Sequence, residues 1–258
     1  MKEKKNKMKY KLTLEYFGAN FFGWQKQKGL RTVQGVLEET LKKIYGKEIS
    51  VQGASRTDAK VHAHGQVAAF IPPFLNIGPH ELKKALNRLL PWDVKVKDIQ
   101  IVPICFHPVK DAKAKYYIYK IYNADYLSPF YYQRAYFVKE PINIFSFEKI
   151  LKIFVGKKDF GAFCAKEDKE KKNTIRFLFD IFVDKSEENV IDIHFFGESF
   201  LRHQIRRIVG TALACYFKKI KAEDILKAFE TRETMPYSVP GEGLYLMKVF
   251  YEDIYEKV

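Results

Sequence analysis

The sequence has few cysteines and no long apolar run. Its 258 residues include three cysteines, Cys105, Cys164 and Cys215, which lie far apart among apolar neighbours. This odd number and spacing favour buried free thiols over disulfide bonds or a zinc site. No stretch approaches the ~18 consecutive apolar residues of a membrane-spanning helix. The charged first nine residues also lack the apolar core of a signal peptide. We therefore expect a globular cytoplasmic protein with no membrane segment.

Motifs that bind nucleotide cofactors are missing as well. The sequence has neither a Walker phosphate loop nor the glycine fingerprint of a Rossmann fold. His62 and His64 would share one face of a strand, but the other ligands of a metal site do not accompany them. We expect no cofactor and no bound metal.

Acidic residues are outnumbered by basic ones. The chain has 45 Lys and Arg against 31 Asp and Glu, which gives a formal net charge of +14 and a pI near 9.4. Such a charge concentrates polyanions, so nucleic acid or an anionic membrane surface are the expected partners. A lysine-rich surface that reflects biased composition explains the same numbers, and charge alone leaves these readings open.

The first half of the chain predicts the order β-α-β-β-α-β. Alternating apolar residues indicate strands, apolar residues at helical spacing indicate helices, and Gly46 and Pro91 mark helix ends. The predicted segments are a strand at 12–16, a helix at 33–44, strands at 49–51 and 67–71, a helix from 79 to 90 and a strand at 94–102.

The second half predicts the same order. Ser146 is the expected cap of its first helix, and the charged residues 165–172 are expected to form a loop. The predicted segments are a strand at 117–121, a helix at 147–155, strands at 175–183 and 191–195 joined by a polar turn at 185–189, helices at 202–218 and 222–230 and a strand at 244–249.

These patterns predict the domain organisation. We expect a basic tail at residues 1–9 and two α/β halves at residues 10–108 and 109–258, each ferredoxin-like in element order. Their largely antiparallel sheets could join and leave a central cleft, which is the expected site.

One stretch, residues 53–70, organises the candidate chemistry. It places Arg56 and Asp58 in a predicted loop between two strands, where sites are commonly built. Other polar residues at predicted element ends are Tyr117 with Lys115, and the start of the long helix, where Arg202 and Arg206 would lie one turn apart. Taken alone, each of these groups also fits an ordinary exposed surface.

Several blocks together resemble one known family. Arg56-Thr57-Asp58-Ala59, followed by Val61-His62-Ala63 and Gly65-Gln66-Val67, is similar to the catalytic signature of the tRNA pseudouridine synthase A (TruA) family. The resemblance covers nearly the whole chain after residue 9, in family order. The further blocks are Gly23-Trp24-Gln25, Thr32-Val33-Gln34-Gly35, Leu86-Asn87, Leu90-Pro91, Phe106-His107, Tyr117-Ile118-Tyr119, Asp159-Phe160, Phe163, Phe200-Leu201, Arg206, Val209-Gly210 and Gly243-Leu244-Tyr245-Leu246.

This resemblance implies a pseudouridine-synthase fold and a role for each candidate residue. Asp58 would be the catalytic carboxylate, either as a covalent nucleophile or by stabilising charge and moving a proton, and both roles stay open. Arg56 would replace the flipped-out base. Tyr117 would pack on the flipped uracil and is a candidate for removing its C5 proton, and Arg206 would pair with Asp58. Lys115, Arg202 and His203 would contact the RNA.

The resemblance also implies a substrate and an assembly. The family acts without a cofactor on uridines 38, 39 and 40 of the tRNA anticodon arm, as a homodimer. A pseudouridine synthase for another RNA position and a non-catalytic RNA-binding relative remain as alternatives. The sequence departs from the family pattern at Lys60, where glycine is usual, at Lys115, where arginine is common, and at Arg207, where asparagine is frequent.

Overall fold

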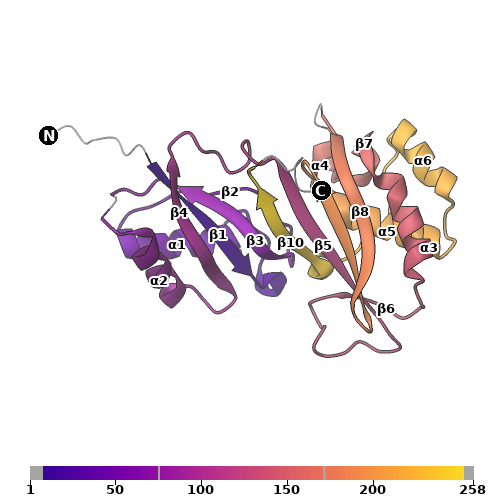
Figure 1. Cartoon of the computed structure of the whole chain (residues 1–258), viewed down its shortest axis with the longest axis horizontal. Helices are drawn as coiled ribbons and strands as arrows, with labels where there is room; N and C mark the ends of the chain where they lie inside the picture. Colours follow the sequence, from indigo (N-terminus) through magenta and orange to yellow (C-terminus); the bar gives the residue numbers. More distant parts are fainter. Residues whose placement is uncertain (1–7, 75, 171–172, 253–258) are drawn as a thin grey trace. The chain divides into compact units, whose positions relative to one another are not determined.

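The computed structural model describes residues 8–74, 76–170 and 173–252. The chain divides into two compact units (Figure 1). The first comprises the chain up to Ala112 together with Leu246–Glu252, and the second comprises Lys113–Tyr245. None of the helices among the described residues is long and apolar enough to cross a membrane.

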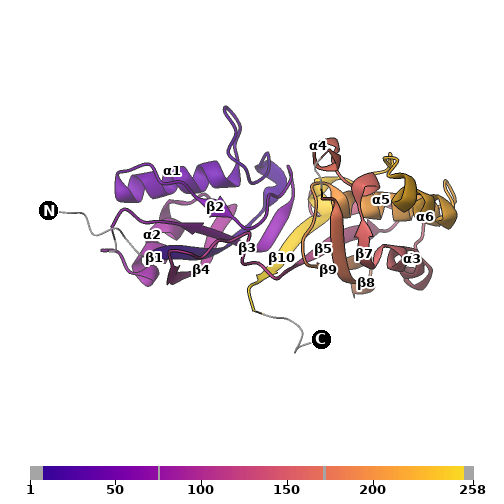
Figure 2. The same cartoon turned by 90° about the horizontal axis from the view of Figure 1, so that it is seen from above.

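The first unit has the predicted β-α-β-β-α-β order. Its strands run in the order β4-β1-β3, β2 also pairs with β3, and the ladders joining these four strands are antiparallel. Figure 2 shows helices α1 and α2 beside these strands. The elements are β1 (Met8–Tyr16), the 3-10 turn η1 (Gly18–Asn20), α1 (Val33–Tyr45), β2 (Gln52–Gly53), β3 (His62–Phe70), α2 (Pro79–Leu89) and β4 (Val94–Pro103).

The prediction of a strand at residues 49–51 was wrong. Ile49 and Val51 are buried, but the strand β2 begins only at Gln52. A hydrogen bond explains part of this difference, because the backbone N–H of Val51 donates to the Glu38 carboxylate at 3.1 Å. The apolar residues of this run therefore serve the core without joining the sheet.

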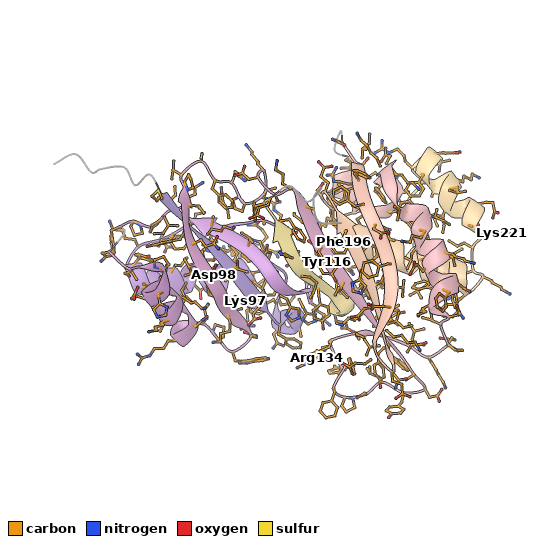
Figure 3. All side chains as sticks on the ribbon, viewed as in Figure 1. Lys97, Asp98, Tyr116, Arg134, Phe196 and Lys221 are labelled. Atoms are coloured by element: carbon orange, nitrogen blue, oxygen red, sulfur yellow. The ribbon has the colours of Figure 1, made fainter. Side chains whose placement is uncertain are left out.

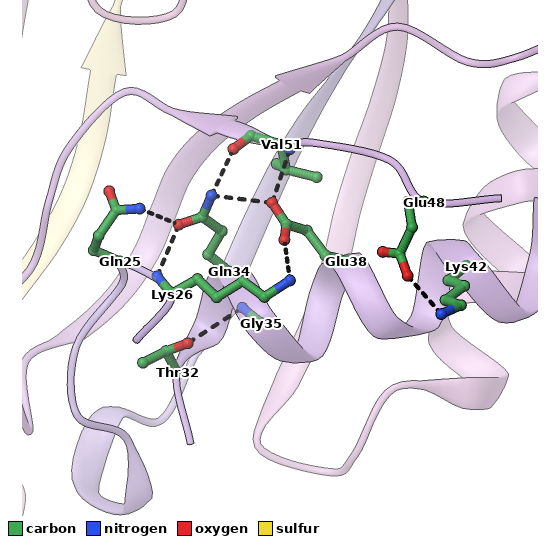
Figure 4. Close-up of polar contacts among 9 residues, drawn as sticks. All are labelled: Gln25, Lys26, Thr32, Gln34, Gly35, Glu38, Lys42, Glu48 and Val51. Atoms are coloured by element: carbon green, nitrogen blue, oxygen red, sulfur yellow. Dashed lines mark hydrogen bonds and ion pairs between the residues drawn. The ribbon is translucent and has the colours of Figure 1, made fainter. Parts of the chain in front are cut away.

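Helix α1 begins and ends as its sequence predicts. The Thr32 hydroxyl accepts a hydrogen bond from the Gly35 N–H at 3.3 Å, which satisfies one of the free amides of the first turn. Gly46 ends the helix with a φ of 67°, a conformation that glycine adopts without strain. Near the Thr32 cap, the buried Gln34 amide donates to Glu38 and to the Val51 carbonyl, both at 3.0 Å (Figure 4).

The second unit contains a sheet with strand order β5-β9-β8-β7, in which the ladders between neighbours are antiparallel. Strand β6 pairs with β5 in parallel. The elements are β5 (Ala114–Asn123), β6 (Tyr136–Val138), α3 (Ile144–Leu151), η2 (Lys152–Phe154), β7 (Gly156–Asp159), η3 (Gly161–Phe163), α4 (Lys166–Lys169), β8 (Ile175–Glu187), β9 (Val190–Gly197), α5 (Gln204–Tyr216), α6 (Ala222–Thr231), η4 (Gly241–Gly243) and β10 (Leu244–Phe250).

The last strand, β10, is divided between the units. Leu244 and Tyr245 belong to the second unit, whereas its residues from Leu246 onward belong to the first. There β10 lies beside β3, and a Cβ on Gly65 of β3 would lie 2.2 Å from the Met247 carbonyl oxygen. The sequence had assigned this strand wholly to the second half.

Two other expectations for the second half were wrong in detail, and two short strands were missed. Asn143, three residues before Ser146, caps α3, since its side chain accepts the Ser146 N–H at 3.0 Å. Residues 166–169 of the expected charged loop form the short helix α4, and residues 171–172 lie outside the described residues. Strands β6 and β7 were not predicted, because segments of three and four residues carry too little periodicity.

The two faces of the second sheet differ. Tyr117, Tyr119 and Ile121 of β5 are buried on one face. On the other, Tyr116 and Phe196 lie side by side on β5 and β9 (Figure 3), with ring centroids 4.2 Å apart and planes 6° apart. Alternation along β5 thus places Tyr117 on the face opposite to this stacked pair.

The Thr32 cap yields a test of the α1 boundary. Replacing Thr32 by Ala removes the acceptor for the Gly35 N–H, so the free energy of unfolding should fall by about 1 kcal/mol. Thr32→Ser keeps the hydroxyl and should retain most of the stability. Urea denaturation of the three proteins gives the comparison, and equal losses for Ala and Ser would contradict the capping role.

Candidate active site

The loop between β2 and β3 carries Asp58, which is half-buried, and Arg56, which is exposed. Backbone hydrogen bonds hold this loop. The Trp24 N–H donates to the Thr57 carbonyl at 3.0 Å, and the Val61 N–H donates to the Asp58 carbonyl at 3.2 Å. The position of Asp58 is therefore fixed through its own backbone and through that of the preceding residue.

Two glycines allow the segment before α1 to approach this loop. A Cβ on Gly23 would lie 2.6 Å from the Thr57 carbonyl oxygen, and Gly23 has a φ of +89°. A Cβ on Gly18 would lie only 2.0 Å from the Val61 carbonyl oxygen. No other residue type fits these positions without displacing the Asp58 loop.

Gln66 holds the loop from the side of β3, a role that was not predicted from the sequence. Its side chain is fully buried. The Gln66 amide oxygen accepts the Ser55 N–H at 3.2 Å, and its amide nitrogen donates to the Ser55 carbonyl at 2.8 Å. The same loop is held at Thr57, whose hydroxyl lies 2.8 Å from the Tyr16 hydroxyl. We call the two hydrogen bonds between Gln66 and Ser55 the Gln66 clamp. They are visible only in the fold, which brings β3 beside the loop.

Lys60 adopts the conformation that glycine would adopt freely. Its φ is 65°, so the loop adopts a positive φ at the position where the family usually has glycine. A non-glycine residue in this region costs about 1–2 kcal/mol. Its N–H donates to the Phe21 carbonyl at 3.1 Å, which helps to hold the strained turn.

In the second unit, Tyr117 and Lys115 lie on the same face of β5. Tyr117 is 5% exposed and meets the Phe200 ring edge to face, with centroids 5.1 Å apart. Phe200 also lies over Gly197, the β9 partner of Lys115. Burial, together with the positive charge of Arg176, lowers the pKa of Lys115 from its usual 10.5 to about 8.

Arg206 lies in the first turn of α5, half-buried. Its Nε donates to the Val239 carbonyl at 2.8 Å, and the Val239 N–H donates to the Arg206 carbonyl at 3.2 Å. The segment that precedes η4 thus fixes both the backbone and the side chain of this arginine.

Arg202 and His203 do not lie on the helix that the sequence predicts for them. Helix α5 begins at Gln204, and His203 precedes it with a φ of 65°. Arg202 is exposed, and its backbone N–H donates to the Asp168 carboxylate at 2.8 Å. The expectation that Arg202 and Arg206 lie one turn apart on a single helix face was therefore wrong.

One group of potential metal ligands occurs among the described residues. Asp184, Asp192 and His194 place one ligand atom each within 4.8 Å of the others. The Lys120 ammonium contacts both Asp192 oxygens, at 2.8 and 2.6 Å, and His194 Nδ1 lies 2.6 Å from the Tyr116 hydroxyl. His194 Nε2 also lies 3.1 Å from an Asp184 carboxylate oxygen, so the three side chains and their partners form a polar network.

The lowered pKa of Lys115 predicts a pH dependence of stability. The pKa of Lys115 is about 8 in the folded chain and higher in the unfolded chain. At pH values between these two pKa values, Lys115 is protonated in the unfolded chain but has lost its proton in the folded chain. Raising the pH through this window therefore favours folding, by up to about 1.4 kcal/mol per unit.

Lys115→Met removes this titration while keeping a long side chain. The free energy of unfolding of the wild type, measured against that of Lys115→Met by urea denaturation, should rise from pH 8 towards pH 10.5. Parallel pH curves for the two proteins would contradict the assignment.

Comparisons with known proteins agree with the resemblance found in the sequence. A relative from Acetivibrio thermocellus, named tRNA pseudouridine synthase A, is 37% identical over 243 residues, covering 93% of this chain and 98% of the relative. Another of that name, from Thermodesulfovibrio yellowstonii, is 38% identical over 253 residues, covering 93% and 98%. Among solved structures, a chain of the archaeal box H/ACA sRNP Nop10-Cbf5 complex aligns with a TM-score of 0.35 and 10% identity over 76% of this chain and 43% of that chain, a likeness too weak to carry any conclusion.

The family model described as tRNA pseudouridine synthase matches residues 13–110 and 150–252. These ranges include the Asp58 loop and Arg206. The mixed α/β architecture, with its mostly antiparallel strands, is the one expected for such an enzyme. On the family match and the relatives together, this chain belongs to the tRNA pseudouridine synthase family.

Proposed function

We propose that this isomerase, an intramolecular transferase, converts uridine to pseudouridine at nucleotides 38, 39 and 40 of the tRNA anticodon arm. Membership of the family makes the chain a tRNA-modifying isomerase. The observation that carries the finer proposal is the loop of Asp58, held by Trp24, Gln66 and Tyr16. A single carboxylate can act only if its position relative to the target base is fixed, and this loop supplies such support.

Asp58 is the proposed catalytic residue. The bond between uracil N1 and ribose C1′ breaks, the base rotates, and a bond forms between C5 and C1′. The C5 proton then leaves and N1 carries a proton, so substrate and product contain the same atoms and no co-reactant is consumed. Asp58 would act either as a nucleophile at C1′ or by stabilising positive charge on the sugar and moving a proton.

The other site residues have proposed supporting roles. Arg206, held by Val239, would pair with Asp58 and keep it ionised. Tyr117 would pack on the flipped uracil and assist removal of the C5 proton. Arg56, exposed on the Asp58 loop, would fill the space that the flipped base leaves.

Contacts with the RNA are assigned to cationic residues. Lys115, Arg202 and His203 are proposed to contact the tRNA, with Lys115 limited by its burial. The net charge of +14 supports tRNA as the partner, and tRNA binding should weaken as salt rises.

The domain organisation, assembly and location are proposed as well. Residues 10–108 would be the half that supplies Asp58, and residues 109–258 the half that supplies Tyr117 and Arg206. The protein would act as a homodimer in the cytoplasm, where tRNA is found.

Replacing Asp58 by Asn tests the reaction and its catalyst together. The amide keeps the size of the side chain but loses the charge, so pseudouridine formation should fall by at least ~1,000-fold, as when a covalent or acid–base group is removed. Pseudouridine is mapped in an unmodified tRNA transcript after incubation with each protein. Modification outside the anticodon arm would identify a synthase for another position. Salt-sensitive tRNA binding without modification by the wild type would leave a non-catalytic RNA-binding protein for that substrate.

Substitutions at Gln66 test whether its hydrogen bonds to Ser55 are needed for catalysis. Gln66→Ala leaves the Ser55 amide and carbonyl without these partners, so kcat should fall by about 10- to 100-fold while KM for tRNA changes little. Gln66→Glu can still accept from the Ser55 N–H and should lie between Ala and the wild type. Gln52 is exposed in the same unit, so Gln52→Ala is the matched control.

The Gln66 comparison requires folded protein. Buried groups left unpaired cost about 1–3 kcal/mol, so thermal unfolding of each variant sets the assay temperature below its transition. A Gln66→Ala enzyme with the kcat of the wild type at that temperature would show that the clamp is not needed for the reaction.

A further inference from the structure

The two tryptophans of this chain differ in exposure. Trp24 is 2% exposed and belongs to the core, whereas Trp92 is 71% exposed. Trp92 lies in the connection between α2 and β4. So large an aromatic surface in water is available for contact with a partner.

Trp92 is the outer end of a row of three rings. The Phe17 ring stacks on the His62 ring, with centroids 4.9 Å and planes 30° apart. On the other side, the Trp92 and Phe17 centroids lie 6.0 Å apart with planes tilted by 32°. We call His62, Phe17 and Trp92 the ring row. One end of this row is buried and the other end lies in solvent.

Backbone contacts hold the ring row in place. The Gly18 N–H donates to His62 Nδ1 at 2.9 Å, and the Phe17 N–H donates to the Asp93 carbonyl at 3.0 Å. The second contact joins the chain at Phe17 to the residue that follows Trp92. The exposed ring is therefore displayed on a rigid support.

The inner end of the ring row adjoins the Asp58 loop. His62 is the first residue of β3, directly after that loop. Its neighbour Val61 donates its N–H to the Asp58 carbonyl at 3.2 Å. A nucleotide stacked on Trp92 would thus contact the outer end of a row of rings whose inner end, His62, directly follows the Asp58 loop.

The charged residues that neighbour Trp92 in the sequence favour an anionic partner. Asp93, the next residue, is 3% exposed, and both its oxygens bind Arg31 at 2.8 Å, which neutralises its charge. Arg88, in the last turn of α2, and Lys95, on β4, flank Trp92 in the sequence. The Lys95 ammonium donates to the Leu90 carbonyl at 3.2 Å, and an exposed aromatic ring combined with cationic residues is typical of surfaces that bind single-stranded nucleic acid.

We infer that the ring row is a base-stacking platform on which an unpaired RNA base near the target uridine stacks on Trp92. This inference rests on the proposed function for its partner and adds a binding residue that the site described above does not contain. Stacking tolerates any base, because each has a π face, so the platform would add affinity for an unpaired loop without selecting its sequence.

Trp92→Ala and Trp92→Phe test the platform, with an unmodified anticodon stem-loop transcript as the probe. Its affinity is measured by fluorescence anisotropy of a labelled transcript, and quenching of the protein's own tryptophan emission is recorded in parallel. Because Trp24 is buried, quenching reports mainly on Trp92. Phe145 is 76% exposed on α3 of the second unit, so Phe145→Ala is the matched loss of an exposed ring.

We expect Trp92→Ala to bind the transcript about tenfold more weakly, equivalent to about 1.4 kcal/mol. Quenching should be lost in this variant. Trp92→Phe should retain most of the affinity, and Phe145→Ala should bind like the wild type. Wild-type affinity in Trp92→Ala, or an equal loss in Phe145→Ala, would overturn the platform. A lower molar mass of Trp92→Ala in solution would do so too, since it would identify the ring as a contact between protein chains.

Pseudouridine formation by the wild type, measured on the same transcript, separates this inference from the proposed function. If the wild type forms pseudouridine and Trp92→Ala binds equally well, only the platform is wrong. If the wild type forms none, the proposed function is wrong for this substrate. Quenching and affinity still decide in that case whether RNA stacks on Trp92.

Discussion

The close approach of two backbone segments is the constraint on which the candidate site depends. The segment around Gly18 and Gly23 lies so near the Asp58 loop that a single Cβ at either position would meet a carbonyl oxygen within 2.6 Å. This contact lets the Trp24 N–H reach the Thr57 carbonyl. An irregular loop usually loses its conformation to chain entropy. Here hydrogen bonds from three different parts of the first unit oppose that loss.

Strained backbone occurs next to the proposed functional residues in both units. Lys60 and His203 both have a φ of 65°. The first lies two residues after Asp58, and the second lies three residues before Arg206. Strain of this kind persists only where surrounding contacts enforce it, and it is found most often at functional sites. Lys60 keeps the turn although its side chain disfavours it, which indicates that the backbone path matters more than the residue that occupies it.

The sequence predicted elements with strong local patterns and missed features that depend on distant contacts. Gly46 and Pro91 each marked a helix end correctly, because glycine and proline act on the local backbone conformation. Asn143 and Ser146 are both good cap residues, and periodicity alone did not distinguish them. The helix start at Gln204 was missed because the apolar pattern continues through Leu201.

The site was predictable only in part. The loop position of Asp58 followed from its turn-forming neighbours, while its chemical role came from resemblance and stays a prediction. The clamp of Gln66 could not be predicted, because it joins residues 11 positions apart across β3 and the loop. The contact of Trp92 with Phe17 could not be predicted either, because the two residues lie in connections that are 75 positions apart in the sequence.

The divided strand β10 has a consequence for synthesis of the protein. The first unit includes Leu246–Glu252, which the ribosome makes only after the whole of Lys113–Tyr245. At typical elongation rates this delay is on the order of ten seconds. During that time β3 lacks its neighbour from the chain end, so the nascent first unit exposes an unpaired strand edge that other chains could join. The first unit therefore receives its last strand only when nearly the whole chain has been made.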